Sequence, residues 1–280
     1  MIGLHAVKSH PSLLAFRTVF PERPTAIALT GTDLFQDGST LTEFLDSLRL
    51  ADRIIALQSH IGRFVPLELQ CKIRVIEQSC AVPASLPPPA GVGFPVCVMG
   101  HLRSVKDPLL TARAARRLPP ESLIEIAHLG AALTVKDRIA AEREQIENPR
   151  YRWIGELPRD EAIRLLARCR LLVMSSRAEG GPSAISEAIA CGVPILSTPT
   201  SGALGLLGEG YPGYFPFGDE KQLAQLMGRC EREPEFLQSL KGACESLKPL
   251  FEPARELEKW REFLDEWLPK NKSNQTIPFK

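Results

Sequence analysis

Short apolar runs alternate with amphipathic stretches along almost the whole of this 280-residue chain. The apolar runs have the length of buried strands, and the amphipathic stretches repeat at helical spacing. The expected strands are Ile2–Ala6, Thr25–Leu29, Arg53–Leu57, Ile73–Gln78, Val96–Met99, Leu123–Leu129, Tyr151–Ile154, Leu171–Ser175 and Val193–Ser197. The expected helices are Ser12–Val19, Leu41–Leu48, Pro108–Leu118, Val135–Glu147, Asp160–Arg168, Ser183–Ala190, Asp219–Glu231, Glu235–Lys248 and Glu252–Trp267. This alternation predicts an α/β fold of mostly parallel sheets covered by helices, with ligands at the carboxyl ends of the strands.

A proline-rich stretch divides the chain. Residues 79–95 contain three consecutive prolines among alanines and glycines, which is typical of a semi-rigid linker. We therefore expect a small N-terminal α/β domain over 1–78 and a larger C-terminal α/β domain over 96–250. A C-terminal helix within 251–270 is expected to pack back on the N-terminal domain, and the polar tail 271–280 to be disordered.

Composition excludes several classes of protein. The formal net charge is +1, which argues against a nucleic-acid partner or an acidic membrane surface bound through bulk charge. No stretch reaches the roughly 18 apolar residues that a membrane span needs, and the N-terminus does not resemble a signal peptide. The seven cysteines are scattered and never form a CxxC pair, so neither a disulfide framework nor a metal site is predicted. We expect a reduced, cytoplasmic protein without stable membrane association. The sequence leaves its oligomeric state open.

The segment Glu179–Glu187, EGGPSAISE, follows an expected strand and begins an expected helix. Gly180 and Gly181 allow the backbone to approach a ligand closely, and Pro182 suits the first helical position. The N–H groups near Ser183, at the positive end of the helix dipole, form an anion site that matches a diphosphate. The same letters also begin ordinary helices, so this segment alone does not decide the function.

Two carboxylates flank this turn. Glu187 lies one turn into the expected helix, and a carboxylate there can accept both hydrogen bonds from a vicinal diol such as a ribose. Glu179, in the loop before the helix, is placed to reach sugar hydroxyls.

A second cluster follows the strand Val96–Met99. Gly100, His101, Arg103 and Lys106 share one short loop at the expected carboxyl end of that strand. Arg103 and Lys106 there can neutralise a departing diphosphate. The alternative is a solvated basic turn with a structural histidine, which is the commoner fate of such residues. Taken with the Glu179 segment, the loop indicates the other half of one nucleotide site.

These residues resemble a known family. Glu179-x7-Glu187 with the following Ala188–Ile195, the loop Val98–Lys106 and Trp153–Gly155 are similar to the EX7E signature and the neighbouring motifs of glycosyltransferase family 4. The resemblance covers most of residues 96–220. It implies a GT-B fold, in which two Rossmann-like domains face each other across a cleft, and no obligatory metal. No cofactor is implied other than the nucleotide sugar as co-substrate.

A closer resemblance extends along the chain, to the selenosugar synthases of selenoneine biosynthesis. It rests on Leu4–Ala6, Pro24–Asp33, Ala51–Arg53, Gly100–Pro108, Tyr151–Leu157, Ser175–Gly181 and Gly210–Phe215. Those enzymes join a sugar from a UDP-sugar to selenophosphate and form a carbon–selenium bond. The resemblance implies the same activity here, with a sugar of glucose or N-acetylglucosamine type. It implies Lys106, Arg103 and the helix N-terminus stabilising the departing UDP, Glu187 holding the ribose and Glu179 the sugar.

The chain departs from these patterns at two places. Family 4 carries an arginine where this chain has His101, so Arg103 is expected to share that role with Lys106. The selenosugar synthases begin with a further strand, helix and strand before the segment that matches Leu4. The N-terminal domain is therefore predicted to be incomplete, without the glycine-rich loop that lies near donor and acceptor in GT-B enzymes.

The acceptor side carries fewer signals. A small selenophosphate anion favours hydroxyls, N–H groups and cations at the ends of the N-terminal strands. The candidates are His5, Lys8, Thr30, Gly31, Thr32 and Asp33. The two threonine hydroxyls and the glycine N–H are expected to donate to oxyanion oxygens, while Asp33 orients a cation. Thr-Gly-Thr-Asp is also good turn chemistry, so a purely structural turn is the alternative. Two other functions stay open: a family 4 transferase with a hydroxyl acceptor, and a non-catalytic sugar-nucleotide-binding fragment.

Overall fold

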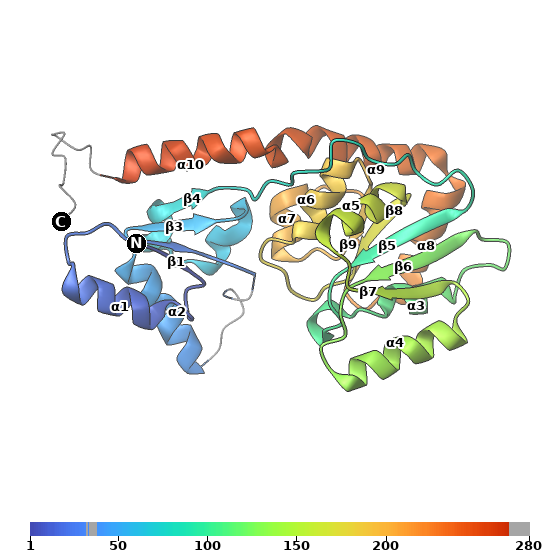
Figure 1. Cartoon of the computed structure of the whole chain (residues 1–280), viewed down its shortest axis with the longest axis horizontal. Coiled ribbons are helices and arrows are strands. Elements are labelled where there is room, and N and C mark those ends of the chain that lie inside the picture. The colour runs from blue at the N-terminus through green and yellow to red at the C-terminus, as the bar shows by residue number, and fades with distance from the viewer. Residues whose placement is uncertain (32, 34–37, 269–280) are drawn as a thin grey trace.

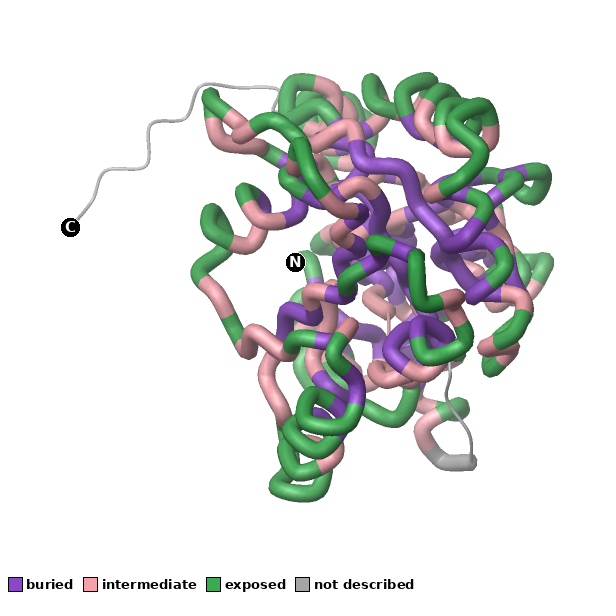
Figure 2. Tube along the Cα trace, turned by 90° about the vertical axis from the view of Figure 1, so that its right-hand side faces the viewer, coloured by how far each residue is buried: buried purple, intermediate pink, exposed green. Residues whose placement is uncertain are grey.

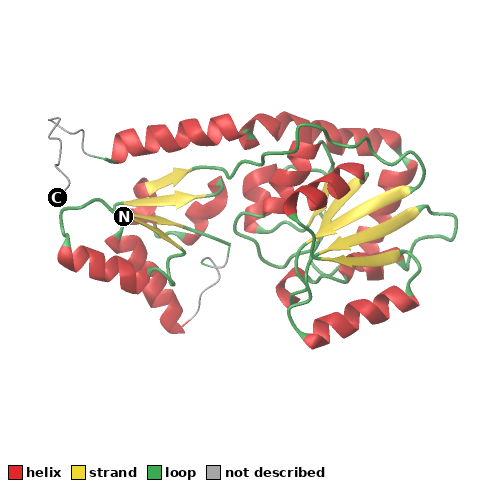
Figure 3. Ribbon diagram, in the orientation of Figure 1, coloured by secondary structure: helices red, strands yellow, loops and turns green. Residues whose placement is uncertain are grey.

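The computed structural model of this chain describes residues 1–31, 33 and 38–268 (Figure 1). Two parallel sheets form the centres of two lobes that lie side by side. The N-terminal lobe contains the elements from β1 to β4, and the C-terminal lobe contains those from β5 to α9. Helix α10 then runs back over the N-terminal lobe (Figure 3). The predicted α/β class with parallel sheets is confirmed.

The N-terminal lobe is a four-stranded sheet in the order β1-β2-β3-β4 with all neighbours parallel. Its elements are β1 (Ile2–Leu4), α1 (His10–Val19), β2 (Ala26–Ala28), α2 (Gly38–Leu50), β3 (Arg53–Ala56), the 3-10 helices η1 (Ser59–Phe64) and η2 (Leu67–Lys72), and β4 (Ile73–Val75). On one face, Leu13 and Leu48 form a core with Ile27 and Ile54 of the sheet. Burying these apolar side chains is what holds the short strands together.

The other face of this sheet is covered by α10 (Pro253–Trp267). Phe263 is almost fully buried against Ala26, Ala28 and Ile55. Lys259 Nζ also forms an ion pair with Glu77 and donates to the Val75 carbonyl at 3.2 Å. The last helix of the chain thus completes the core of its first lobe.

The C-terminal lobe has a five-stranded parallel sheet in the order β7-β6-β5-β8-β9. Its elements are β5 (Phe94–Met99), η3 (Ser104–Lys106), α3 (Leu110–Ala115), β6 (Ile124–Leu129), α4 (Val135–Glu147), β7 (Tyr151–Gly155), α5 (Arg159–Arg168), β8 (Leu171–Met174), α6 (Ser183–Cys191), β9 (Ile195–Ser197), α7 (Ser201–Leu207), α8 (Glu220–Arg232), α9 (Pro234–Leu247) and η4 (Lys248–Phe251). The chain order reverses at β5, and β8 pairs with β5 directly. The loops after these two strands therefore meet at one edge of the sheet.

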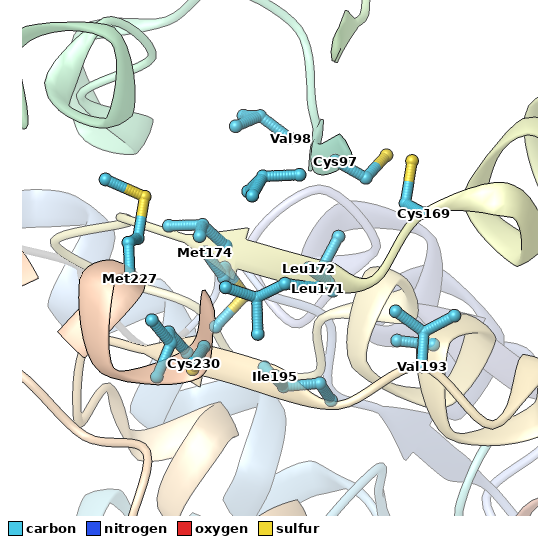
Figure 4. Packing of buried hydrophobic residues seen from close by; sticks show 14 of the residues in the cluster. Cys97, Val98, Cys169, Leu171, Leu172, Met174, Val193, Ile195, Met227 and Cys230 are labelled. Atoms are coloured by element: carbon cyan, nitrogen blue, oxygen red, sulfur yellow. The ribbon is translucent and has the colours of Figure 1, made fainter. Parts of the chain in front are cut away.

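The core of the C-terminal lobe surrounds β5, β8 and β9, whose inner residues are fully buried. Buried residues, purple in Figure 2, gather in the interior of this lobe. Figure 4 shows Leu171, Leu172 and Ile195 among the packed side chains, with the sulfur atoms of Cys97 and Cys169 close together. A hydrogen bond with Cys169, together with burial, raises the pKa of the Cys97 thiol. All seven cysteines are free, and Cys97 packs as a small apolar residue.

All predicted strands are present with shifted ends, and the linker runs without helix or strand from Ile76 to Gly93. The prediction missed α7, because its sequence SGALGLL is apolar all round and rich in glycine, so it shows no helical periodicity. Its start was readable, since Thr200 caps the helix by accepting from the Ala203 N–H. No helix in the described part of the chain has both the length and the apolarity to cross a membrane.

Candidate active site at the junction of the two lobes

A cavity of about 470 Å³ lies at the carboxyl ends of the strands of the C-terminal lobe, beside the N-terminal lobe. Nine of the residues expected to bind substrate line it: Gly31, Gly100, His101, Arg103, Lys106, Glu179, Gly181, Ser183 and Glu187. Met99, Leu129 and Met174, which end β5, β6 and β8, form part of its wall. The two loops predicted to form one site are therefore brought together.

A larger cavity of about 740 Å³ lies between the linker and α5. Its lining is mainly apolar, with Pro87, Ala90 and Leu165 among its residues. Its strand residues, Pro95 and Ala127, do not come from the carboxyl ends of their strands. We therefore take the smaller, polar cavity as the candidate active site.

Lys106 and Glu179 form an ion pair inside this cavity. Lys106 Nζ lies 2.7 Å from Glu179 Oε1, which also accepts from the Ser176 hydroxyl at 2.8 Å. Gly100 makes room for this lysine, because a Cβ atom at Gly100 would lie 2.9 Å from Lys106 Cδ. A side chain at this position would therefore press on the Lys106 side chain.

The loop that carries Lys106 is fixed to the loop after β8. The Ser175 hydroxyl lies 3.0 Å from the Lys106 carbonyl, and the Arg177 N–H donates to the Val105 carbonyl at 2.7 Å. Arg103 lines the cavity from the exposed side of the same loop. These contacts hold the backbone of the loop in place at the edge of the cavity.

His101 has a defined tautomer. Its Nδ1 atom accepts from the Ala131 N–H at 3.1 Å, so the neutral ring carries its proton on Nε2. Because His101 lines the cavity, the imidazole can offer an N–H donor where family 4 offers a guanidinium.

A buried histidine supports the loop from behind. His128 is fully buried, its Nε2 lies 3.1 Å from the Gly100 carbonyl, and its Nδ1 lies 2.8 Å from the Tyr151 hydroxyl. Burial lowers the pKa of His128 to about 4, with the bond to Gly100 opposing the shift. The neutral ring therefore donates from Nε2 to Gly100 and accepts from Tyr151. These two hydrogen bonds fix the Gly100 carbonyl at the start of the loop Gly100–Lys106, called the cation loop below.

We expect the chain to become less stable as the pH falls, because His128 is buried in its neutral form. Its pKa is about 4 in the folded state, whereas that of an ordinary histidine is 6.5, so the unfolded chain binds the proton more tightly. The free energy of unfolding is therefore lost as the pH falls below 6.5, by about 2 kcal/mol between pH 7 and pH 4.5. Urea unfolding at pH 7 and pH 4.5 gives the free energy of unfolding of each protein. Between these pH values the unsubstituted chain should lose about 2 kcal/mol more than His128→Gln. Equal losses in the two proteins would contradict it.

The N-terminus of α6 faces the same cavity. The helix begins at Ser183, and Pro182 precedes it as the capping residue, one position earlier than predicted. Proline offers no side-chain cap, so the first N–H groups, those of Ser183 and Ala184, are left for a ligand. Glu187 lines the cavity one turn further, and burial raises the pKa of its carboxyl against the opposing charge of Arg159.

Gly180 does not line this cavity. It was predicted to admit a ligand, but a Cβ atom there would lie 2.6 Å from Gly31 Cα. The glycine instead allows the backbones of the two lobes to touch. Gly181 lines the cavity and also contacts the N-terminal lobe, where a Cβ atom would meet Leu57 at 2.8 Å.

The acceptor-side candidates divide into two groups. Gly31 reaches the cavity, and Thr32 lies outside the described residues. Asp33 is fully buried and accepts from the Ala6 N–H at 2.9 Å and from both the N–H and the hydroxyl of Thr30. The Thr30 hydroxyl therefore donates to Asp33. The prediction that it donates to an oxyanion of the substrate is wrong for this structure.

Two basic candidates flank this turn. Asp33 Oδ1 lies 2.9 Å from His5 Nδ1, so the basic group beside Asp33 is a protein side chain. Lys8 is exposed and does not line the cavity. The buried Asp33 carboxylate thus holds the turn in its shape. Among the acceptor-side candidates that the structure describes, only Gly31 lines the cavity.

Several residues at or near the site were missed. Leu129 ends β6 and Gly130 follows it, and Glu156 and Leu157 follow β7; all four line the cavity. The strand-end rule used for β5 and β8 finds them as well. Gln58, which reaches from the N-terminal lobe to the Gly180 carbonyl at 3.1 Å, carried no signal in the sequence.

Comparison with known proteins decides the family. Residues 94–244, more than half of the chain, match the family described as Glycosyl transferases group 1. The chain belongs to this family. The matched residues carry nearly the whole cavity wall, including the cation loop and α6. No curated protein matches the chain. Among the described residues, no three His, Cys, Asp or Glu side chains are grouped to hold a metal ion.

Solved structures agree with this membership. The Anabaena protein HepE in complex with UDP-glucose has a TM-score of 0.77 at 18% identity, over 92% of this chain and 77% of that one. Sucrose-phosphate synthase from Thermosynechococcus elongatus has a TM-score of 0.73 at 15% identity, over 95% of this chain and 73% of that one. At these identities the likeness shows the fold. The predicted GT-B fold is confirmed, and the group 1 member described here is a glycosyltransferase.

Proposed function

We propose that this glycosyltransferase uses a UDP-sugar as its donor and binds it in the cavity at the junction of the lobes. The observation that carries the proposal is the ligand chemistry gathered there. Lys106, Arg103 and the N-terminus of α6 surround one space, and Glu187 lies one helical turn beyond. These groups match a diphosphate and a ribose diol. Three structures of similar fold support the choice of nucleotide, because HepE was solved with UDP-glucose, with UDP, and with UDP and glucose.

The proposed reaction is a substitution at the anomeric carbon of the donor sugar. The bond from that carbon to the diphosphate oxygen breaks as the acceptor forms its own bond to carbon, and UDP leaves with the electron pair. Lys106 and Arg103 stabilise the charge that develops on the diphosphate, and Glu179 holds sugar hydroxyls. Glu179 also holds Lys106 in place before the donor arrives, through their 2.7 Å contact. No metal is required for this charge stabilisation.

We further propose selenophosphate as the acceptor, with a sugar of glucose or N-acetylglucosamine type. This finer proposal rests on the resemblance of the segments from Leu4–Ala6 to Gly210–Phe215 to selenosugar synthases. A selenium nucleophile is already reactive near neutral pH, so the site needs no dedicated base. The product carries a carbon–selenium bond and keeps its phosphoryl group until water removes it.

Turnover with defined acceptors tests the proposal. The purified chain is incubated with UDP-glucose or UDP-N-acetylglucosamine, and with selenophosphate, inorganic phosphate or no acceptor. Among these conditions, we expect UDP release only when selenophosphate is the acceptor. Mass spectrometry should then detect a selenium-containing sugar. UDP release only with a hydroxyl acceptor would replace selenophosphate by a conventional acceptor. UDP binding without release under any condition would contradict catalysis by this chain.

A further inference from the structure

Gln58 connects the N-terminal lobe to the donor cavity. It follows β3, and its side chain is fully buried between the lobes although it is polar. Its Nε2 atom donates to the Gly180 carbonyl at 3.1 Å, and its Oε1 atom accepts from the His60 N–H at 2.5 Å. Both ends of the amide are therefore used, and its orientation is fixed.

The C-terminal lobe is shaped to admit this side chain. A Cβ atom at Gly205 in α7 would lie 2.0 Å from Gln58 Oε1, so only glycine fits there. Helix α7 lies at the lobe junction in Figure 1, and Tyr214 Oη donates to its Ala203 carbonyl at 3.0 Å. The amide is thus held in a slot built from both lobes, on a helix that is itself anchored.

Gln58 holds the Gly180 carbonyl, which belongs to the loop 179–181, called the donor loop below. The Glu179 carbonyl accepts from the Gly202 N–H at 2.8 Å, within the C-terminal lobe. The next carbonyl, that of Gly180, accepts from Gln58 of the N-terminal lobe. Glu179 on one side of this peptide pairs with Lys106, and Gly181 on the other side lines the cavity. The position of the donor loop therefore depends on the N-terminal lobe.

We propose that Gln58 is a positioning residue, which ties the loop 179–181 to the N-terminal lobe and so couples donor binding to the contact between the two lobes. The inference rests on the proposed function of the cavity. Removing the amide leaves the buried Gly180 carbonyl without this donor and frees the loop to shift. From the cost of an unpaired buried acceptor, we expect UDP affinity to fall roughly tenfold. Linkage requires that a bound donor strengthen the contact between the lobes by the same factor.

The test compares UDP affinity, measured by isothermal titration calorimetry, in Gln58→Leu, Gln58→Glu and Arg63→Ala. Leucine keeps the volume and loses the donor, and a carboxylate places an acceptor against the Gly180 carbonyl. Arg63→Ala is the matched control, because it removes the exposed Arg63–Glu209 ion pair between the same two lobes. We expect a roughly tenfold loss in both Gln58 variants and a change within about twofold in the control.

The pH dependence separates positioning from mere stability. When the introduced carboxyl of Gln58→Glu is protonated, it regains a donor for the Gly180 carbonyl. Relative to the unsubstituted chain at the same pH, we expect its UDP affinity to recover as the pH falls, whereas that of Gln58→Leu does not recover. Gly205→Ala, which displaces the Gln58 amide from the other lobe, should reproduce the loss and serves as the second variant if Gln58→Leu does not fold.

Two results would overturn the inference. Gln58 variants with a lower melting temperature but unchanged UDP affinity at every pH would show a purely structural residue, with the proposed donor site intact. Absence of UDP binding to the unsubstituted chain would overturn the proposed function itself, and the inference with it.

Discussion

Replacing Lys106 by alanine should lower kcat by about 10²- to 10³-fold and donor affinity by less than tenfold. The lysine faces a charge that grows on the diphosphate as the sugar bond breaks, so its effect is larger in the transition state than in the bound ground state. Its ammonium is already held in the cavity by Glu179 at 2.7 Å, so no reorganisation is needed when the donor binds. Steady-state kinetics of UDP release, with donor binding measured separately, gives both quantities.

The matched control is Lys136→Ala, which removes the same charge from an exposed position on α4. Its kcat should equal that of the unsubstituted chain. A fall in kcat of equal size in both variants would assign the effect to net charge and remove Lys106 from the site.

Lys106 and Glu179 should also be coupled energetically. Without the lysine, the Glu179 carboxylate remains beside the position proposed for the diphosphate and repels it. We therefore expect Lys106→Ala combined with Glu179→Gln to be less impaired than the product of the two single effects. If the activity loss of the double variant equals the product of the two single losses, Lys106 and Glu179 are not coupled and the prediction is contradicted.

Replacing Glu187 by alanine should weaken UDP binding by about 10- to 100-fold, the worth of hydrogen bonds to a charged group. The loss should appear mainly in donor affinity, because the ribose is bound equally in the ground and transition states. Titration calorimetry with UDP checks this, and Glu187→Gln, which keeps the shape and one acceptor, should lie between alanine and wild type.

The acid dependence of UDP binding should report the same carboxyl. Burial raises the pKa of Glu187, so it takes up its proton at a higher pH than an ordinary glutamate. Wild-type affinity should therefore begin to fall above the usual glutamate range, and this component should be missing in Glu187→Gln. Parallel pH profiles in the two proteins would contradict a role for the ionised carboxylate.

The sequence predicted the parts of the site that obey local rules. Gly100 to Lys106 and Glu179 to Glu187 each follow an apolar strand, and those strands, β5 and β8, are neighbours in the sheet. Because the carboxyl ends of neighbouring parallel strands meet at one edge of a sheet, the sequence predicts both loops in one cavity. The same rule, applied to the ends of β6 and β7, also indicates Leu129 and Glu156.

The remaining features depend on contacts between distant segments. Gln58 is an ordinary polar residue until α7 and the Gly180 carbonyl surround it. Asp33 looked like a turn residue facing substrate, whereas in the fold it is buried and bonds to Ala6, 27 residues away in the chain. His128 similarly acquires its lowered pKa only through burial beneath Gly100. No local pattern encodes such pairings, because they arise when the lobes and loops pack.

A structure of the chain with bound UDP-glucose tests the central claim most directly. The diphosphate should contact Lys106, Arg103 and the N-terminus of α6, and the ribose hydroxyls should contact Glu187. UDP-glucose bound instead in the cavity of about 740 Å³ between the linker and α5, or a diphosphate that does not touch Lys106, would contradict the assignment of the donor site.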